Sequence, residues 1–160
     1  MFNYIYRCVG HRQDAEDLLQ DVFMKIHKSL PAEIAPEEIR PWIFTVTRNT
    51  IRDYYRRRKV RENYLVDTED ISEFIAGVGN NSFSPEKYVL TAEMQAKFEK
   101  IIPELPVHLK EVFLLRHQAG LSFKQIAEML DCPVNRLLGR MHLAMKKIRH
   151  EMEKYLKEGE

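Results

Sequence analysis

The sequence predicts an all-α protein made of two small helical domains joined by a flexible linker. Three observations indicate this fold class. Apolar residues recur at steps of three and four along most of the chain, which is the period of an amphipathic helix. Residues 64–91 interrupt that pattern with glycine, asparagine, serine and scattered acids, which are typical of a linker. Residues 121–142 have the pattern of a helix-turn-helix. We therefore expect one domain at residues 1–63 and a second at residues 92–160.

Composition narrows the classes of function. The chain is 44% apolar and 31% charged, which predicts a soluble protein with apolar cores rather than a disordered chain. Its two cysteines are far apart and neither CxxC nor HExxH occurs, so we expect no metal site and no cofactor. No nucleophile pattern or phosphate-binding loop appears, which argues against an enzyme. Because there is no signal peptide and no apolar run long enough to cross a bilayer, we expect a cytoplasmic protein without membrane insertion.

The first two predicted helices lie at residues 1–9 and 14–30, with a break at Gly10. The second carries a broad apolar stripe and an acidic start. Carboxylates in a first turn stabilise the positive end of a helix by about 0.3–1 kcal/mol each. We assign this role to Asp14, Glu16 and Asp17. Gln20 and Asp21 extend the polar face further along the helix, where capping explains them less well.

The most informative stretch is a third helix, predicted from Pro36 to about Glu62. One side is apolar and is expected to face the core: Trp42, Ile43, Val46, Thr50, Ile51 and Tyr54. Cationic, amide and aromatic groups lie together elsewhere on this helix: Arg48, Asn49, Arg52, Tyr55 and Arg56. Such a mixture favours a nucleic-acid-binding helix. A basic face that is merely solvated is an equally good interpretation of this helix alone.

The C-terminal domain is predicted to hold four helices without a sheet, in a winged-helix-like arrangement. Its first two helices are expected at residues 92–102 and 107–119, stopped by Pro103 and Gly120 respectively.

A helix-turn-helix follows. Ser122 and Gln125 form a capping box that starts a short helix, and Pro133 prevents that helix from continuing. A longer helix then runs over residues 134–155. In this motif the first turns of the second helix enter the major groove of DNA, where Asn pairs with adenine and Arg with guanine or phosphate. The candidate contacts are Asn135, Arg136, Arg140 and His142. A plain helical hairpin is the alternative, and the pattern favours DNA binding.

Three stretches in order resemble the extracytoplasmic-function sigma factors of bacterial RNA polymerase, which belong to the sigma-70 family. The polymerase-binding helix of that family is similar to QDAEDLLQDVFMKI. Its promoter-melting helix is similar to IRPWIFTVTRNTIRDYYRRRK. Its C-terminal promoter-reading domain is similar to ELPVHLKEVFLLRHQAGLSFKQIAEMLDCPVNRLLGRMHLAMKKIR.

The resemblance implies a role for each group of residues. The surface that docks on core RNA polymerase would comprise Asp14, Glu16, Asp17, Gln20 and Asp21. The surface that reads and opens the minus-ten element would comprise Arg48, Asn49, Arg52, Tyr55 and Arg56, with the loop at residues 31–38 taking up a flipped base. The surface that meets the minus-thirty-five element would comprise Ser122, Lys124, Asn135, Arg136, Arg140 and His142.

The implied function is promoter-specific transcription initiation, with core RNA polymerase and promoter DNA as partners and an anti-sigma factor as a possible inhibitor. The alternative is a sigma-like DNA-binding regulator or adaptor that does not itself initiate. Two departures from the family pattern bear on this choice. The first helix begins later than is usual, so we expect either a trimmed start or a first domain built on a shortened helix. Leu138 and Leu143 replace residues that are usually basic, and we expect them to contact thymine methyl groups or a protein partner.

Overall fold

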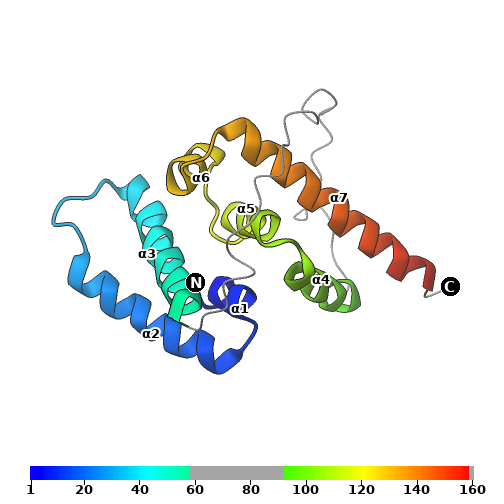
Figure 1. The fold of residues 1–160 in the computed structure, drawn as a ribbon, viewed down its shortest axis with the longest axis horizontal. Helices are drawn as coiled ribbons and strands as arrows, with labels where there is room; N and C mark the ends of the chain where they lie inside the picture. Colours follow the sequence, from blue (N-terminus) through cyan, green and yellow to red (C-terminus); the bar gives the residue numbers. More distant parts are fainter. Residues whose placement is uncertain (58–91, 159–160) are drawn as a thin grey trace.

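Seven α-helices and no strand are present in residues 1–57 and 92–158, the parts of the chain that the computed structural model describes (Figure 1). This confirms the all-α class. The helices are α1 (Phe2–Val9), α2 (Arg12–Ser29), α3 (Pro36–Arg57), α4 (Ala92–Glu104), α5 (Val107–His117), α6 (Phe123–Leu130) and α7 (Val134–Glu158). The predicted linker at 64–91 and the last six residues of the first predicted domain lie outside the described residues.

The first helical unit consists of α1, α2 and α3, which pack on one another. Gly10 ends α1 in the left-handed conformation, with φ of 79°, and its N–H donates to the Tyr6 carbonyl at 2.8 Å. Glycine adopts this conformation without a Cβ clash, so the chain turns sharply into α2. α2 and α3 then form a helical hairpin through a loop at residues 30–35 (Figure 1).

α2 begins two residues earlier than the sequence suggested. The helix starts at Arg12, with His11 as its N-cap, so only Asp14 lies in the first turn. Glu16 and Asp17 lie one turn further on. Since the helix dipole acts within the first turn, it accounts for Asp14 alone. The other acids therefore need a different explanation.

The buried face of α3 also differs from the predicted one. Thr50 and Ile51 are buried as expected, but Trp42 is only half-buried, and the other buried positions are Phe44 and Thr47. The Phe44 ring meets the Tyr4 ring of α1 edge-to-face, with centroids 5.3 Å apart. Packing against α1 thus turns α3 so that Phe44, rather than Trp42, faces inward. Edge-to-face pairs add roughly 0.5–1.5 kcal/mol beyond the area they bury.

Pro41 lies in the second turn of α3 without ending the helix. Proline has no N–H, so the Glu37 carbonyl one turn earlier loses its usual helical partner. The Gln125 side-chain amide of α6 donates to that carbonyl at 3.4 Å. A group from the second helical unit therefore meets the acceptor that Pro41 leaves free.

The second helical unit is built around α5. Leu109, Val112, Phe113, Leu114 and Leu115 are all buried, so this helix is apolar on nearly every side. A helix of that kind must be surrounded, and both α6 and α7 pack on it. The preceding helix α4 ends at Glu104, two residues later than predicted. Pro103 therefore lies in its last turn instead of stopping the helix before it.

The helix-turn-helix is confirmed as a local structure. Both hydrogen bonds of the capping box are present: Gln125 N–H donates to the Ser122 hydroxyl at 3.2 Å, and Ser122 N–H donates to the Gln125 side chain at 2.9 Å. Asp131 ends α6 in the left-handed conformation, with φ of 48°. α7 then starts at Val134 and buries Leu137, Ala144 and Ile148 along one side.

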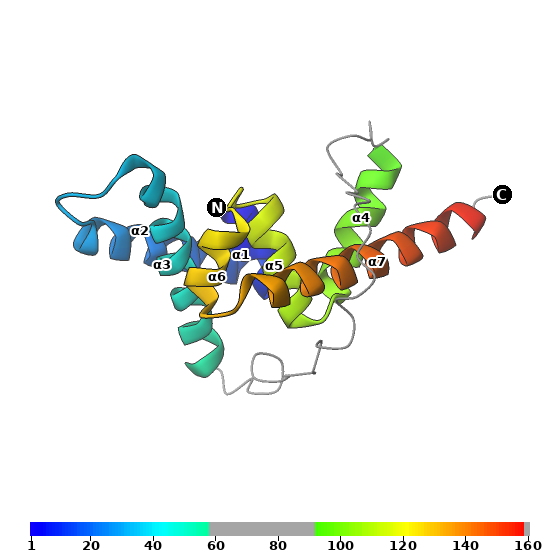
Figure 2. The same ribbon diagram turned by 90° about the horizontal axis from the view of Figure 1, so that it is seen from above.

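The two units pack against each other. Figure 2 shows α5 and α6 beside α1 and α3, while α7 extends away towards the C-terminus. Buried apolar residues of both units belong to one continuous cluster. In the described parts of the chain, no helix is long and apolar enough to cross a membrane.

Candidate polymerase and DNA surfaces

The acids of α2 fall into two groups. Asp14 is half-buried and accepts a 2.7 Å hydrogen bond from the Tyr54 hydroxyl of α3. Glu16 is exposed and pairs with Arg12 at 2.8 Å. Asp17, Gln20 and Asp21 are exposed. The predicted polymerase-binding residues therefore share one helix, but Asp14 also serves the α2–α3 contact.

On α3, Asn49 and Arg52 are exposed. Asn49 borders a hollow of about 310 Å³ between α2 and α3. Lys25, Lys28 and Ser29 of α2 and Val46 of α3 complete its lining. The α2 residues were not among those predicted from the sequence. Their spacing of three and four was the available signal, because it places them on one face of the helix.

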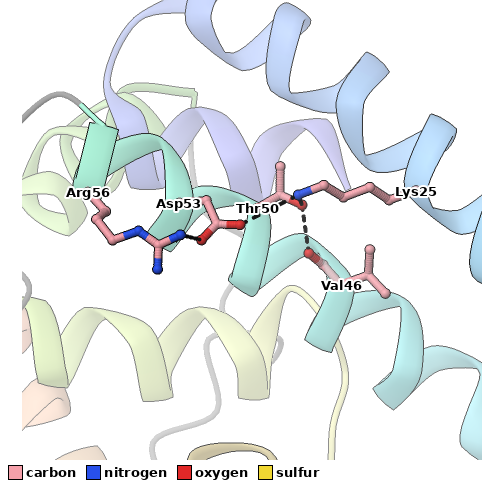
Figure 3. A network of polar contacts seen from close by, with 5 residues as sticks. All are labelled: Lys25, Val46, Thr50, Asp53 and Arg56. Carbon is pink, nitrogen blue, oxygen red and sulfur yellow. Dashed lines mark hydrogen bonds and ion pairs between the residues drawn. The ribbon is translucent and has the colours of Figure 1, made fainter.

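A network of polar contacts connects Lys25, which lines this hollow, to α3 (Figure 3). Lys25 donates to the Thr50 hydroxyl at 3.1 Å, and Thr50 in turn donates to the Val46 carbonyl at 2.9 Å. Asp53 lies 3.7 Å from the Lys25 ammonium and 2.9 Å from the Arg56 guanidinium. One carboxylate thereby holds two cations on the same side of α3.

Arg48 and Tyr55 face the protein interior, unlike Asn49 and Arg52. The Arg48 guanidinium pairs with Glu111 of α5, with Nε and Oε1 2.5 Å apart. The Tyr55 hydroxyl donates to the Cys8 carbonyl of α1 at 2.6 Å, and its ring is half-buried. In this conformation neither side chain belongs to the exposed face of Asn49. Both contacts join residues far apart in the sequence, so sequence periodicity could not indicate them.

The helix-turn-helix presents its predicted contacts unequally. Ser122 and Lys124 are exposed at the start of α6. Asn135 and Arg136 are exposed in the first turn of α7, whereas Arg140 and His142 are half-buried one to two turns later.

The two leucines of α7 are placed differently. The Leu138 side chain is 43% exposed beside the first-turn residues. Leu143 is half-buried and packs against the core, which argues against the predicted contact with DNA or a partner.

Lys110 of α5 lies where the two units meet. Burial lowers the pKa of its ammonium by desolvation, and the nearby Cys8 of α1 partly opposes this effect. Its Nζ donates to the Pro103 carbonyl at 3.3 Å. Within the described residues, no group of three or more His, Cys, Asp and Glu side chains is arranged to hold a metal ion.

Comparison with known proteins connects both units to one family. Residues 1–61 match Sigma-70 region 2, and residues 95–148 match Sigma-70, region 4. The RNA polymerase sigma factor SigZ of Bacillus subtilis is 32% identical over 150 residues, which cover 94% of this chain and 79% of SigZ. The chain belongs to the sigma-70 family of RNA polymerase sigma factors. Its function is therefore that of a sigma factor, which binds core polymerase and directs promoter-specific transcription initiation. Sigma factors are not enzymes.

Two further comparisons support membership of the extracytoplasmic-function group and the fold. The ECF RNA polymerase sigma-E factor of Haemophilus influenzae is 29% identical over 146 residues, covering 89% of this sigma factor and 76% of that one. The sigma factor RpoE of Bartonella quintana, solved with the anti-sigma factor NepR, has a similar fold with a TM-score of 0.68. That likeness covers 95% of this chain and 89% of RpoE at 18% identity.

Proposed function

We propose that this sigma factor carries out initiation through three surfaces. The exposed acids of α2, Asp17 and Asp21 foremost, dock on core polymerase. The face of α3 that bears Asn49 and Arg52 reads and opens the minus-ten element. The first turns of α7, with Asn135 and Arg136, read the minus-thirty-five element.

The observation that carries this proposal is the position of Asn49 beside the hollow between α2 and α3. Asn49 offers an amide to a base edge, while Lys28 on the opposite wall offers a cation to a flanking phosphate. A hollow of about 310 Å³ is large enough to receive one base that has left the stack. Flipping a base costs a few kcal/mol, so contacts of this kind are needed to hold an opened strand.

The helix-turn-helix supports the second DNA contact. Asn135 and Arg136 are exposed where a recognition helix enters the major groove. The exposed N-terminus of α6, capped by Ser122, presents backbone N–H groups suited to a phosphate. Lys124 adds a cation in the same turn. Phosphate contacts would set the register, and the α7 residues would read the bases.

Two elements of the proposal concern the cellular setting. Polymerase and promoter DNA place this activity in the cytoplasm, and no cofactor is required. An anti-sigma factor is the inhibitor we expect, since the structurally similar RpoE was solved in complex with one.

Run-off transcription tests the proposal. Core polymerase is supplied with a pool of random-sequence promoters, with or without this chain. We expect transcripts that share upstream sequences at two separated positions. Asn49→Ala should reduce their yield at least tenfold, whereas Asn3→Ala, at an exposed asparagine on α1, should leave the yield unchanged. Polymerase binding without any stimulated transcript would instead favour a DNA-binding adaptor.

A further inference from the structure

Lys25 joins α2 to α3 beside the hollow that Asn49 borders. Its ammonium donates to the Thr50 hydroxyl at 3.1 Å and lies 3.7 Å from the Asp53 carboxylate (Figure 3). A hydrogen bond from α3 to Asp14 fastens the start of α2, and Lys25 fastens the same helix about one turn before its end. The two contacts therefore hold α2 against α3 along most of its length, with Lys25 nearer the loop.

The Thr50 hydroxyl gives this contact a definite direction. Thr50 is 1% exposed, and its single hydroxyl proton is donated to the Val46 carbonyl at 2.9 Å. The oxygen can therefore only accept from α2, and the Lys25 ammonium supplies the donor. Val46 and Asn49 form the α3 wall of the hollow, and Asn49 is the residue next to Thr50. The contact thus fixes the backbone that carries Asn49 relative to α2.

The α2 wall of the hollow depends on the same side chain. Lys25, Lys28 and Ser29 line it, at the spacing of three and four that places residues on one face of a helix. Because Lys25 reaches from this face to Thr50, the distance between the two walls is set at that point. Lys28, which bears the exposed cation of this wall, is thereby held opposite Asn49.

Asp53 makes a second demand on Lys25. Asp53 lies four residues after Asn49 on the same face of α3, and its side chain is 33% exposed. A carboxylate there would repel the phosphates of a DNA strand unless cations neutralise it. Arg56 pairs with Asp53 at 2.9 Å, but the Arg56 side chain is 80% exposed, and such pairs contribute little. Lys25 is the more enclosed cation, so it serves both the spacing of the helices and charge compensation.

We infer that Lys25 is a positioning residue for the hollow between α2 and α3, in which its hydrogen bond to Thr50 holds Lys28 and Asn49 at the spacing that a flipped base requires. This inference rests on the proposed minus-ten role of Asn49. Phosphate contacts govern the affinity for any strand, whereas base contacts govern the choice between strands and tolerate errors of only about 0.5 Å. Loss of the contact between Lys25 and Thr50 should therefore reduce the preference for one base more than the affinity for single strands in general.

A distance measurement on the full chain tests the spacing of the two helices without DNA. Spin labels are attached at His27→Cys on α2 and Arg52→Cys on α3, both exposed, after the two native cysteines are replaced by serine. We expect a narrow distance distribution for the parent and a broader one for Lys25→Met and for Thr50→Val. Lys100→Met, at an exposed lysine of α4, is the matched control and should keep the parent distribution.

Base preference is measured with the same substitutions in unlabelled chains assembled with core polymerase. Each holoenzyme is incubated with a pool of random single strands, and the bound strands are sequenced. At the most selective position, Lys25→Met and Thr50→Val should reduce the enrichment of the preferred base roughly fivefold or more. Lys25→Arg keeps a cationic donor and should retain the parental enrichment, as should Lys100→Met.

Substitution of Asp53 separates helix spacing from charge compensation. Asp53→Asn keeps the hydrogen bond between Lys25 and Thr50, so it should bind all strands more tightly without changing the enrichment of the preferred base. Lys25→Met combined with Asp53→Asn has the net charge of the parent but lacks that hydrogen bond. We expect this double variant to recover affinity but not base preference. Recovery of both would overturn the inference, because charge compensation alone would then explain Lys25.

The outcomes distinguish the inference from the proposed function. A Lys25→Met variant with the parental distance distribution would overturn the inference, and so would one with the parental base preference. A parent holoenzyme that selects no base at any position would instead contradict the proposed role of Asn49, and the inference that rests on it. Because the Lys25 side chain is 42% exposed, Lys25→Met should fold, and thermal unfolding of each variant checks this.

Discussion

The Tyr54 hydroxyl donates a 2.7 Å hydrogen bond to the Asp14 carboxylate, and this contact ties α3 to the start of α2. Asp14 is half-buried, whereas Asp17 and Asp21, on the same helix, are exposed. All three border a hollow that Tyr54 also lines. The same acidic helix thus uses one carboxylate in the protein's own fold and leaves the other two exposed.

Tyr54→Phe should lower the free energy of unfolding by about 1–2 kcal/mol, because the Asp14 carboxylate loses a donor that is partly shielded from water. Urea denaturation measures this. Tyr6→Phe is the control, since Tyr6 is 42% exposed, and its unfolding free energy should change by less than about 0.5 kcal/mol. Equal stability of the two variants would show that the Asp14 contact contributes nothing.

Asp17→Asn combined with Asp21→Asn should weaken binding to core polymerase roughly tenfold, because charge complementarity governs such docking. The loss should shrink as salt is raised. Binding is followed by fluorescence anisotropy at two salt concentrations. Glu104→Gln with Glu153→Gln removes the same charge from exposed positions on α4 and α7. If that control lost as much affinity, net charge rather than the α2 surface would be responsible.

Local patterns predicted most of the secondary structure, and long-range contacts account for what they missed. The capping box of Ser122 and Gln125 was recoverable because both partners lie within one turn. The pairing of Arg48 with Glu111 joins residues 63 positions apart, and no periodicity reports such a contact. Sequence reasoning therefore grouped Arg48 with the exposed residues of α3.

The orientation of α3 shows the same limit. Its sequence contains apolar residues on more than one side, so both Trp42 and Phe44 were possible core residues. Tyr4 on α1 decides between them by packing on Phe44. Asn49 is exposed, and its role in reading DNA stays a prediction. The lysines of α2 that line the same hollow were not anticipated, because they belong to a different helix.

Phe44→Ala should lower the free energy of unfolding by about 3–5 kcal/mol, since the side chain is only 8% exposed. Trp42→Ala removes a larger side chain that is only half-buried, and it should cost less than Phe44→Ala. Urea denaturation of the two variants shows directly which substitution lowers the free energy of unfolding more. A greater loss from Trp42→Ala would mean that α3 is rotated relative to this structure.

Lys110→Met should raise the free energy of unfolding at neutral pH, because burial lowers the pKa of the Lys110 ammonium by desolvation. Between that lowered pKa and the ordinary value of about 10.4, the unfolded chain holds a proton that the folded chain has released. Lys110 therefore makes the free energy of unfolding of the parent rise with pH across this window. The gain in unfolding free energy from Lys110→Met should therefore shrink as the pH rises through this window.

The comparison is made in a Cys8→Ser background, which removes the nearby thiol that acts on the Lys110 ammonium. Urea denaturation of parent and variant at several pH values gives the difference. A difference that stays constant with pH would show that lost packing or hydrogen bonding, rather than desolvation of the ammonium, separates the two chains.

Leu138 should make the minus-thirty-five contact sensitive to thymine methyl groups, because its exposed side chain lies beside Asn135 and Arg136 at the start of α7. Removing one facing methyl, by replacing thymine with deoxyuridine, should weaken binding about fourfold, which corresponds to about 0.8 kcal/mol. Leu138→Ala should bind both duplexes equally. Leu30→Ala, at a 54% exposed leucine outside α7, should keep the preference. A parent chain that is indifferent to every thymine methyl in its selected element would show that Leu138 does not contact the base edges.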